Sequence, residues 1–128
     1  MRLTGPVELN VAADSSMMLV IRLTAAGVLT RAGLTLDATD NLKMATEEAC
    51  NCLIGQDNPP ARLKLCFDCT DNRLSIRASA QVEEAPVGNA DETELQVIRC
   101  ILESLADEVS VDVRDGWIHA VELRSALA

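Results

Sequence analysis

The sequence predicts an α+β fold: a two-layer sandwich in which three helices cover one face of a mixed, mostly antiparallel five-stranded sheet. Five short segments alternate apolar and polar residues with the period of a strand, and three longer segments carry apolar residues at helical spacing. Their order is strand, helix, helix, hairpin, helix, hairpin, which favours helices segregated to one face. With 128 residues, 48% of them hydrophobic, we expect a single domain spanning residues 1–128.

The first strand and the first helix are predicted from the N-terminal residues. Residues 7–11 alternate apolar and polar side chains, which indicates a strand with one buried face. Asp14 can cap the helix that follows, and the apolar run from Met17 to Leu29 is long enough for a buried helix. Gly33 is typical of a helix C-terminus, so we expect the helix to stop there.

The second helix is predicted from a stripe of apolar residues. Asp37 can cap it, and Gly55 with Pro59-Pro60 can end it. The stripe is formed by Leu42, Ala45, Ala49 and Leu53.

Two hairpins supply the other four strands. Residues 63–67 and 74–78 alternate around a Thr-Asp-Asn turn, and residues 109–113 and 117–121 flank an Arg-Asp-Gly turn. An Asp-Gly pair suits a tight reversal, so each pair of segments is expected to form a hairpin.

A loop and the third helix are predicted between the two hairpins. Residues 81–91 show no period and contain Pro86 and Gly88, which indicates a loop. Residues 92–107 follow as a helix with a single apolar stripe. That stripe is formed by Leu95, Ile98, Leu102 and Leu105.

Charge and composition exclude several classes of function. The formal charge of −9 would repel a phosphate backbone, and a chain with one Trp, one Phe and no Tyr has few platforms on which bases could stack. We therefore expect no nucleic-acid partner. No apolar segment reaches the ~20 residues that span a bilayer, and no leader is recognised, so we expect no membrane association and a cytoplasmic protein. Five cysteines, an odd number, agree with a reducing compartment without disulfides.

The five cysteines and the one histidine are the residues that could bind a transition metal or act as a nucleophile or base. Cys66-x-x-Cys69 and Cys50-x-Cys52 could together offer four zinc ligands. The first pair lies within a predicted strand and the second has the wrong spacing, so we expect no metal site and interpret these thiols as small hydrophobic groups. His119 has no nucleophile motif beside it, and a structural or surface role is expected.

Two segments resemble a known family. Residues 41–50, NLKMATEEAC, are similar to the Asp-Ile-Lys-x-Ala-x-x-Glu-Ala-Cys helix of the anti-sigma factor serine kinases, and residues 102–111, LESLADEVSV, are similar to that family's closing helix and next strand. The resemblance covers nearly the whole chain. It implies the histidine kinase-like ATPase fold, ATP and Mg²⁺ as cofactors, a dimer, and a sigma factor or an antagonist protein as partner.

The chain departs from the family at the expected magnesium site. In the family, a helical Glu acts as the base and an Asn four residues later binds Mg²⁺; these roles fall on Glu48 and Cys52. Mg²⁺ requires oxygen ligands, so a thiol is a poor replacement. Shifting the pair to Glu47 and Asn51 does not restore the site, because those side chains are expected to point away from the apolar stripe.

Two further nucleotide motifs are missing. Ala80 occupies the position of the Asp in the family's Asp-x-Gly-x-Gly motif, which binds adenine, and residues 96–98 replace the lid's Gly-x-Gly. The loop between them would also oppose a polyphosphate, because it is acidic and has no Lys or Arg. Its acidic residues are Glu83, Glu84, Asp91, Glu92 and Glu94.

These departures lead to a predicted function in regulation. We expect an anti-sigma-factor-like protein that works by partner switching through protein–protein binding, without ATP turnover or cofactor, and that is not an enzyme. The alternative is an active protein serine/threonine kinase that uses ATP and Mg²⁺ to phosphorylate an antagonist; a purely structural role is a third possibility. Met44, Cys50 and Ile54 are expected to lie opposite the core stripe of the second helix and to contribute to a partner or homodimer interface.

Overall fold

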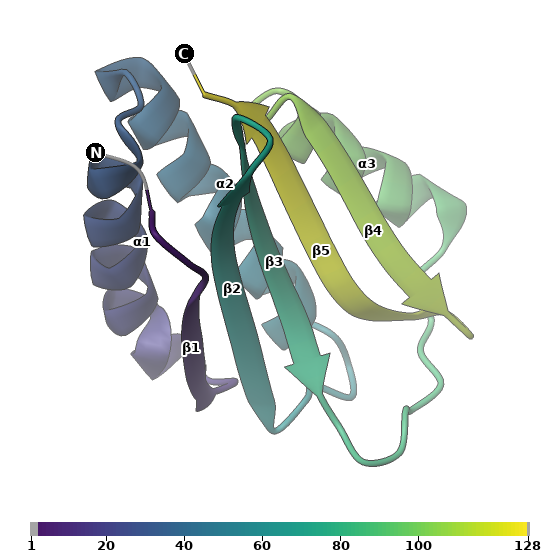
Figure 1. Cartoon of the computed structure of the whole chain (residues 1–128). Coiled ribbons are helices and arrows are strands. Elements are labelled where there is room, and N and C mark those ends of the chain that lie inside the picture. The colour runs from purple at the N-terminus through teal and green to yellow at the C-terminus, as the bar shows by residue number, and fades with distance from the viewer. Residues whose placement is uncertain (1–2, 128) are drawn as a thin grey trace.

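A five-stranded sheet with three helices on one face makes up the computed structural model, which describes residues 3–127 (Figure 1). The sheet order is β1-β2-β3-β5-β4, and each of these neighbouring pairs is antiparallel. The strands are β1 (Val7–Ala12), β2 (Arg62–Thr70), β3 (Arg73–Gln81), β4 (Glu108–Arg114) and β5 (Trp117–Ala126). The helices are α1 (Met18–Ala32), α2 (Leu36–Ile54) and α3 (Glu92–Glu103), with a 3₁₀ turn at Ser15–Met17. The predicted α+β sandwich is confirmed, but the sheet is antiparallel throughout and not mixed as predicted.

Both predicted hairpins form, and both use two-residue turns. Thr70 pairs with Arg73 across the β2–β3 turn, and Arg114 pairs with Trp117 across the β4–β5 turn. In each turn both central residues have a positive φ. Asp, Asn and Gly tolerate this conformation, and it matches the right-handed twist of the flanking strands, which explains why these residues stand there.

The helix ends agree with the predictions except at two places. Asp14 caps the 3₁₀ turn before α1, and Gly33 ends α1 with a φ of 78°. The prediction that Asp37 caps α2 is wrong: the Thr35 hydroxyl accepts from the Ala38 N–H, so the helix begins earlier and Asp37 lies in its first turn. The third helix ends at Glu103 rather than 107, because the chain turns there into β4.

The core lies between the helices and the sheet face that they cover. Alternate residues of β2 and β3 point toward the helices and are fully buried. The largest buried side chains include Phe67, Leu63, Leu65, Leu74, Ile76, Ile21, Leu29, Leu42, Leu53, Leu102 and Leu123. Burial of aliphatic area on this scale is the main stabilising contribution in a chain with so few aromatic residues.

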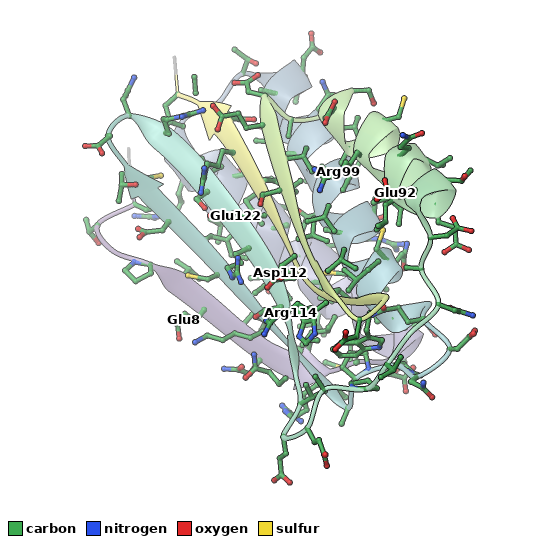
Figure 2. All side chains as sticks on the ribbon, turned by 90° about the vertical axis from the view of Figure 1, so that its right-hand side faces the viewer. Glu8, Glu92, Arg99, Asp112, Arg114 and Glu122 are labelled. Atoms are coloured by element: carbon green, nitrogen blue, oxygen red, sulfur yellow. The ribbon has the colours of Figure 1, made fainter. Side chains whose placement is uncertain are left out.

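The opposite face of the sheet carries no helix and is covered by charged side chains (Figure 2). Glu122 of β5 pairs with Arg77 and Arg124, and Lys64 pairs with Glu8. Each exposed pair contributes little to stability, but together they balance the charge of this face. Within residues 3–127, no helix is long and apolar enough to cross a membrane.

Candidate functional site

Helix α2 lies between α1 and α3, and its flank toward α1 is closed. Cys50 is fully buried there, and Glu47 forms an ion pair with Arg22 of α1. The prediction that Cys50 belongs to an exposed apolar surface is therefore wrong, and Ile54 is partly buried, whereas Met44 is exposed as expected. Cys50 is buried because α1 packs along this flank. The buried surface of α2 is therefore wider than the stripe of Leu42, Ala45, Ala49 and Leu53 predicted.

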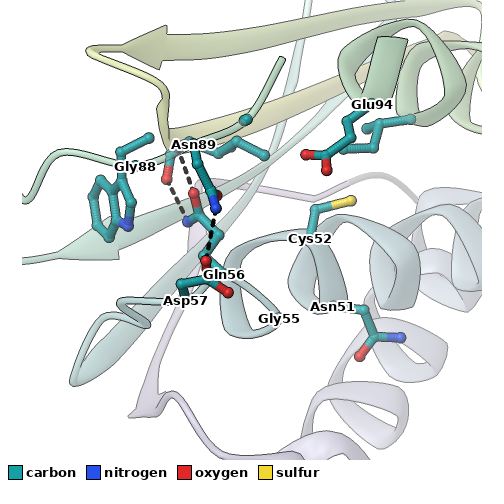
Figure 3. Close-up of a pocket in the computed structure, with 12 residues that line it drawn as sticks. Asn51, Cys52, Gly55, Gln56, Asp57, Gly88, Asn89 and Glu94 are labelled. Carbon is teal, nitrogen blue, oxygen red and sulfur yellow. Dashed lines mark hydrogen bonds between the residues drawn. The ribbon is translucent and has the colours of Figure 1, made fainter. Parts of the chain in front are cut away.

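The flank of α2 toward α3 is open and borders a hollow of about 300 Å³. Cys52 of α2 and Glu94 of α3 point toward one another across it (Figure 3). The hollow is lined by Asn51, Cys52, Gly55, Gln56, Asp57, Gly88, Asn89, Ala90, Glu94, Ile98, Trp117 and Ile118. It is thus formed by the last turn of α2, the loop after β3, the start of α3 and the beginning of β5.

The loop between β3 and α3, residues 82–91, is fastened to the β4–β5 turn by backbone hydrogen bonds. The Gly88 N–H donates to the Asp115 carbonyl at 3.0 Å, and the Ala90 N–H donates to the Gly116 carbonyl at 2.9 Å. The two chains cross so closely that a Cβ added at Gly88 would lie 2.4 Å from the Gly116 oxygen. Glycine is therefore required at this crossing, and these two loop amides already have acceptors.

Side chains from the end of α2 hold the same region. Gln56 donates to the Ile118 carbonyl at 3.0 Å and accepts from the Ile118 N–H at 2.7 Å, while Asn89 donates to the Asp57 carboxylate at 2.8 Å (Figure 3). Each bond joins segments that are more than 30 residues apart in the chain. The loop, α2 and β5 therefore form one connected wall of the hollow.

The electrostatics of the hollow favour a cation. Asp57 and Glu94 contribute carboxylates, and none of the lining residues is Lys, Arg or His. Asp91 caps α3 by accepting from the Glu94 N–H, so carboxylates of the chain already occupy the helix end that attracts anions. Helix α2 points its C-terminal turn at the hollow, and that turn has no basic residue to offset its carbonyl groups.

The thiols of α2 are held in their neutral form. Burial, followed by the negative charge of Glu48, raises the pKa of Cys52 to about 11. Burial also raises the pKa of Cys50 to about 12. A protonated thiol is neither a nucleophile nor a metal ligand, so Cys52 presents a small, weakly polar surface to the hollow.

The predicted site residues occupy different places around the hollow. Cys52 lines it, and Glu48 lies one turn earlier on the same flank, half-buried and close enough to affect the Cys52 thiol. Ala80 lies near the end of β3, paired with Leu63, and is outside the lining. Of residues 96–98, Ile98 lines the hollow. The assigned roles of Glu48, Cys52 and Ala80 as former nucleotide positions remain predictions.

Sequence reasoning missed Gln56, Asp57 and Asn89, which together determine the shape and charge of the hollow. They lie in segments interpreted as helix end and loop, where polar residues are common. Their one available signal was the concentration of amide and carboxylate side chains close to glycines and prolines.

The remaining candidate ligands do not come together. Cys66 lies on the charged face of β2, whereas Cys69 is on the face that packs toward the core. Within residues 3–127, no group of three or more His, Cys, Asp and Glu side chains could hold a metal ion. His119 is buried, with its ring edge-on to Trp117 at 4.9 Å between centroids.

The residues around the hollow do not fit magnesium-bound ATP. The position facing α3 holds a protonated thiol instead of an amide oxygen, and the two carboxylates that line the hollow, Asp57 and Glu94, would repel a polyphosphate. The Gly88 and Ala90 amides, which a phosphate could otherwise accept from, are bonded to the β4–β5 turn.

Comparisons with known proteins agree on one family. No family profile matches the chain. The serine-protein kinase RsbW of Staphylococcus epidermidis is 28% identical over 128 residues, which covers 86% of this chain and 80% of the relative. The anti-sigma-F factor RsbW of Mycobacterium tuberculosis is 35% identical over 74 residues, covering 58% of this chain and 44% of that protein.

A solved structure shares the fold. The RsbU and RsbW domains of a Mycobacterium tuberculosis protein superimpose with a TM-score of 0.73 at 12% identity, over 97% of this chain and 33% of the solved chain. The match shows the architecture. Together the comparisons show that the chain is similar in sequence to RsbW proteins named as a serine-protein kinase and as an anti-sigma-F factor, and similar in fold to a solved RsbW domain.

Proposed function

We propose that this protein is an anti-sigma-type regulator that works by binding a protein partner, without ATP turnover and as a single domain. The observation that carries the proposal is the lining of the α2–α3 hollow: two carboxylates, a protonated thiol and no cationic side chain. This lining opposes a nucleotide polyphosphate. The names of the relatives, serine-protein kinase and anti-sigma-F factor, support a regulatory role.

A partner-binding role agrees with the surface. Helix α1 exposes Leu19, Val20 and Leu23, and α2 exposes Met44. These side chains offer apolar area for a sigma factor, an antagonist protein or a second copy of the chain. A homodimer through this side is part of the proposal.

The alternative is an active serine/threonine kinase with Glu48 as the base, and the family relationship is the observation that favours it. Glu48 lies on the same flank as Cys52, facing α3. A kinase would require Mg²⁺ to find other oxygen ligands and the loop amides to leave the β4–β5 turn.

The proposal is tested by mixing the purified protein with the sigma factor and the antagonist encoded near its gene. Complex formation is measured by size-exclusion chromatography without nucleotide and with Mg-ATP, and phosphate transfer to the antagonist is followed by mass spectrometry. We expect a complex that is independent of nucleotide and an unmodified antagonist. Stoichiometric phosphorylation would establish the kinase alternative, and the lack of any complex would contradict the regulatory role.

A further inference from the structure

We propose that the hollow between α2 and α3, together with the exposed apolar face of α3, receives a basic amphipathic segment of a protein partner. The segment would place a lysine or arginine in the hollow and apolar side chains on α3. This inference deepens the proposed function and rests on it, because it names the surface and the chemistry through which the partner binds.

The hollow is built to hold a cationic side chain. Asp57 approaches from the end of α2, and Glu94 from the first turn of α3 (Figure 3). Asp57 accepts from the neutral amide of Asn89, so its negative charge is not neutralised, and Glu94 forms no ion pair within residues 3–127. The uncompensated C-terminal turn of α2 adds to the negative potential.

An apolar surface continues from the hollow along α3. A second, shallower hollow of about 340 Å³ is lined by Thr93, Glu94, Val97 and Ile98. Glu94 and Ile98 line both hollows, so the acidic and apolar surfaces are adjacent. One turn beyond Val97, which is 55% exposed, Ile101 is 43% exposed on the same side of the helix.

Charge complementarity decides which occupant fits. Residues 83–107 contain seven acidic side chains and one basic one, Arg99, whereas four basic residues of the sheet's charged face are already in ion pairs: Lys64, Arg73, Arg77 and Arg124. An anionic ligand or nucleic acid would be repelled. A second copy of this chain, which also carries a charge of −9, would meet the same repulsion here. A basic segment of a different protein is attracted to the carboxylates and can cover Val97 and Ile101.

The chain provides its own reporter for this binding. Trp117 is the single tryptophan, the chain has no tyrosine, and Trp117, although buried, is one of the residues that line the hollow. A synthetic helical peptide of about 16 residues, with lysines on one face, leucines on the other and no aromatic residue, is titrated while Trp117 fluorescence is recorded. We expect saturable binding that weakens about tenfold when salt is raised to about 0.5 M, and no binding of the same peptide with glutamate in place of lysine.

Matched variants locate the binding surface. Glu94→Gln and Val97→Ser are each expected to weaken peptide binding about tenfold. Glu103→Gln, on the same helix but outside both hollows, and Leu36→Ser, at the exposed start of α2, are expected to change it less than about twofold. Circular dichroism melts confirm that all four variants are folded.

Three results would overturn the inference. They are no peptide binding at millimolar concentration, equal binding of the glutamate peptide, and effects of Glu94→Gln and Val97→Ser that are no larger than those of the two control variants. Its failure differs from failure of the proposed function. If the sigma factor or antagonist binds the wild type and the Glu94→Gln and Val97→Ser variants equally well, the surface is wrong but the regulatory role stands. If the peptide binds in the hollow between α2 and α3 but neither the sigma factor nor the antagonist binds the protein, the regulatory role is wrong instead.

Discussion

The two flanks of α2 carry cysteines two residues apart that occupy opposite environments. Cys50 faces α1 and is sealed in the core, whereas Cys52 faces α3 and lines a hollow of about 300 Å³. The α1 flank is closed by aliphatic packing and by the Arg22–Glu47 ion pair. The α3 flank is held by hydrogen bonds from a loop and remains open. One helix thus belongs to the core on one side and to the site on the other.

Replacing each cysteine by asparagine should show the difference between the two flanks of α2 most clearly. Cys50→Asn puts a larger polar side chain into a filled core and is expected to lower the free energy of unfolding by about 3 kcal/mol. Cys52→Asn borders open space and is expected to cost less than about 1 kcal/mol. Urea denaturation of both variants measures the difference; equal losses would show that the flanks do not differ as described.

The loop that shapes the α3 flank depends on the Gly88–Gly116 crossing. Gly88→Ala would place a methyl group 2.4 Å from the Gly116 oxygen and should lower the free energy of unfolding by about 2 kcal/mol. Gly27→Ala is the matched control on α1, where a Cβ meets no atom within 4 Å. It should raise stability by about 0.5–1 kcal/mol, because alanine favours a helix interior.

Hydrogen exchange shows whether the loop itself is released. In the Gly88→Ala variant, the amide of Ala90, which bonds to Gly116, should exchange faster than in the wild type. Unchanged protection of Ala90 would mean that the crossing does not fasten the loop.

The local signals in the sequence were sufficient for most of the fold. Gly33, Asp115 and Gly116 have a positive φ, which few other residue types tolerate. Their presence in the sequence therefore predicted the end of a helix and the turn of a hairpin correctly. Thr35 and Asp37 are both good caps two residues apart, and only the backbone distinguishes them.

The site was harder to predict than the fold. Whether the side of α2 that carries Cys50 is buried depends on where α1 packs. The sequence of one helix does not encode that tertiary contact. The loop is held by backbone amides and carbonyls, and almost every residue has these groups. The sequence therefore shows this contact only through the glycine at position 88. The family resemblance predicted that the flank of α2 with Glu48 and Cys52 belongs to the site. The other residues that line the hollow are seen only in the structure.

A smaller effect should follow from the raised thiol pKa values. In the unfolded chain the Cys50 thiol ionises near its ordinary pKa of 9.0, but in the folded protein it ionises near about 12. The unfolded state therefore binds fewer protons above pH 9, and stability should fall with rising pH. Between pH 9 and 10 the loss from Cys50 is expected to be about 1 kcal/mol.

Denaturation of the wild type and of Cys50→Ala at pH 8, 9 and 10 checks this effect. The variant should lose less stability over that range, and Cys52→Ala should flatten the dependence by nearly the same amount, because both raised pKa values lie above pH 10. Parallel curves for all three proteins would contradict the assignment.

Isothermal titration calorimetry with Mg-ATP and Mg-ADP tests the central claim most directly, which is that the α2–α3 hollow does not accept a nucleotide. Two carboxylates, a protonated thiol and loop amides that already have acceptors predict no binding heat up to millimolar nucleotide for the wild type and for Cys52→Asn alike. One-to-one binding of either nucleotide at micromolar concentration by the wild type would contradict the account.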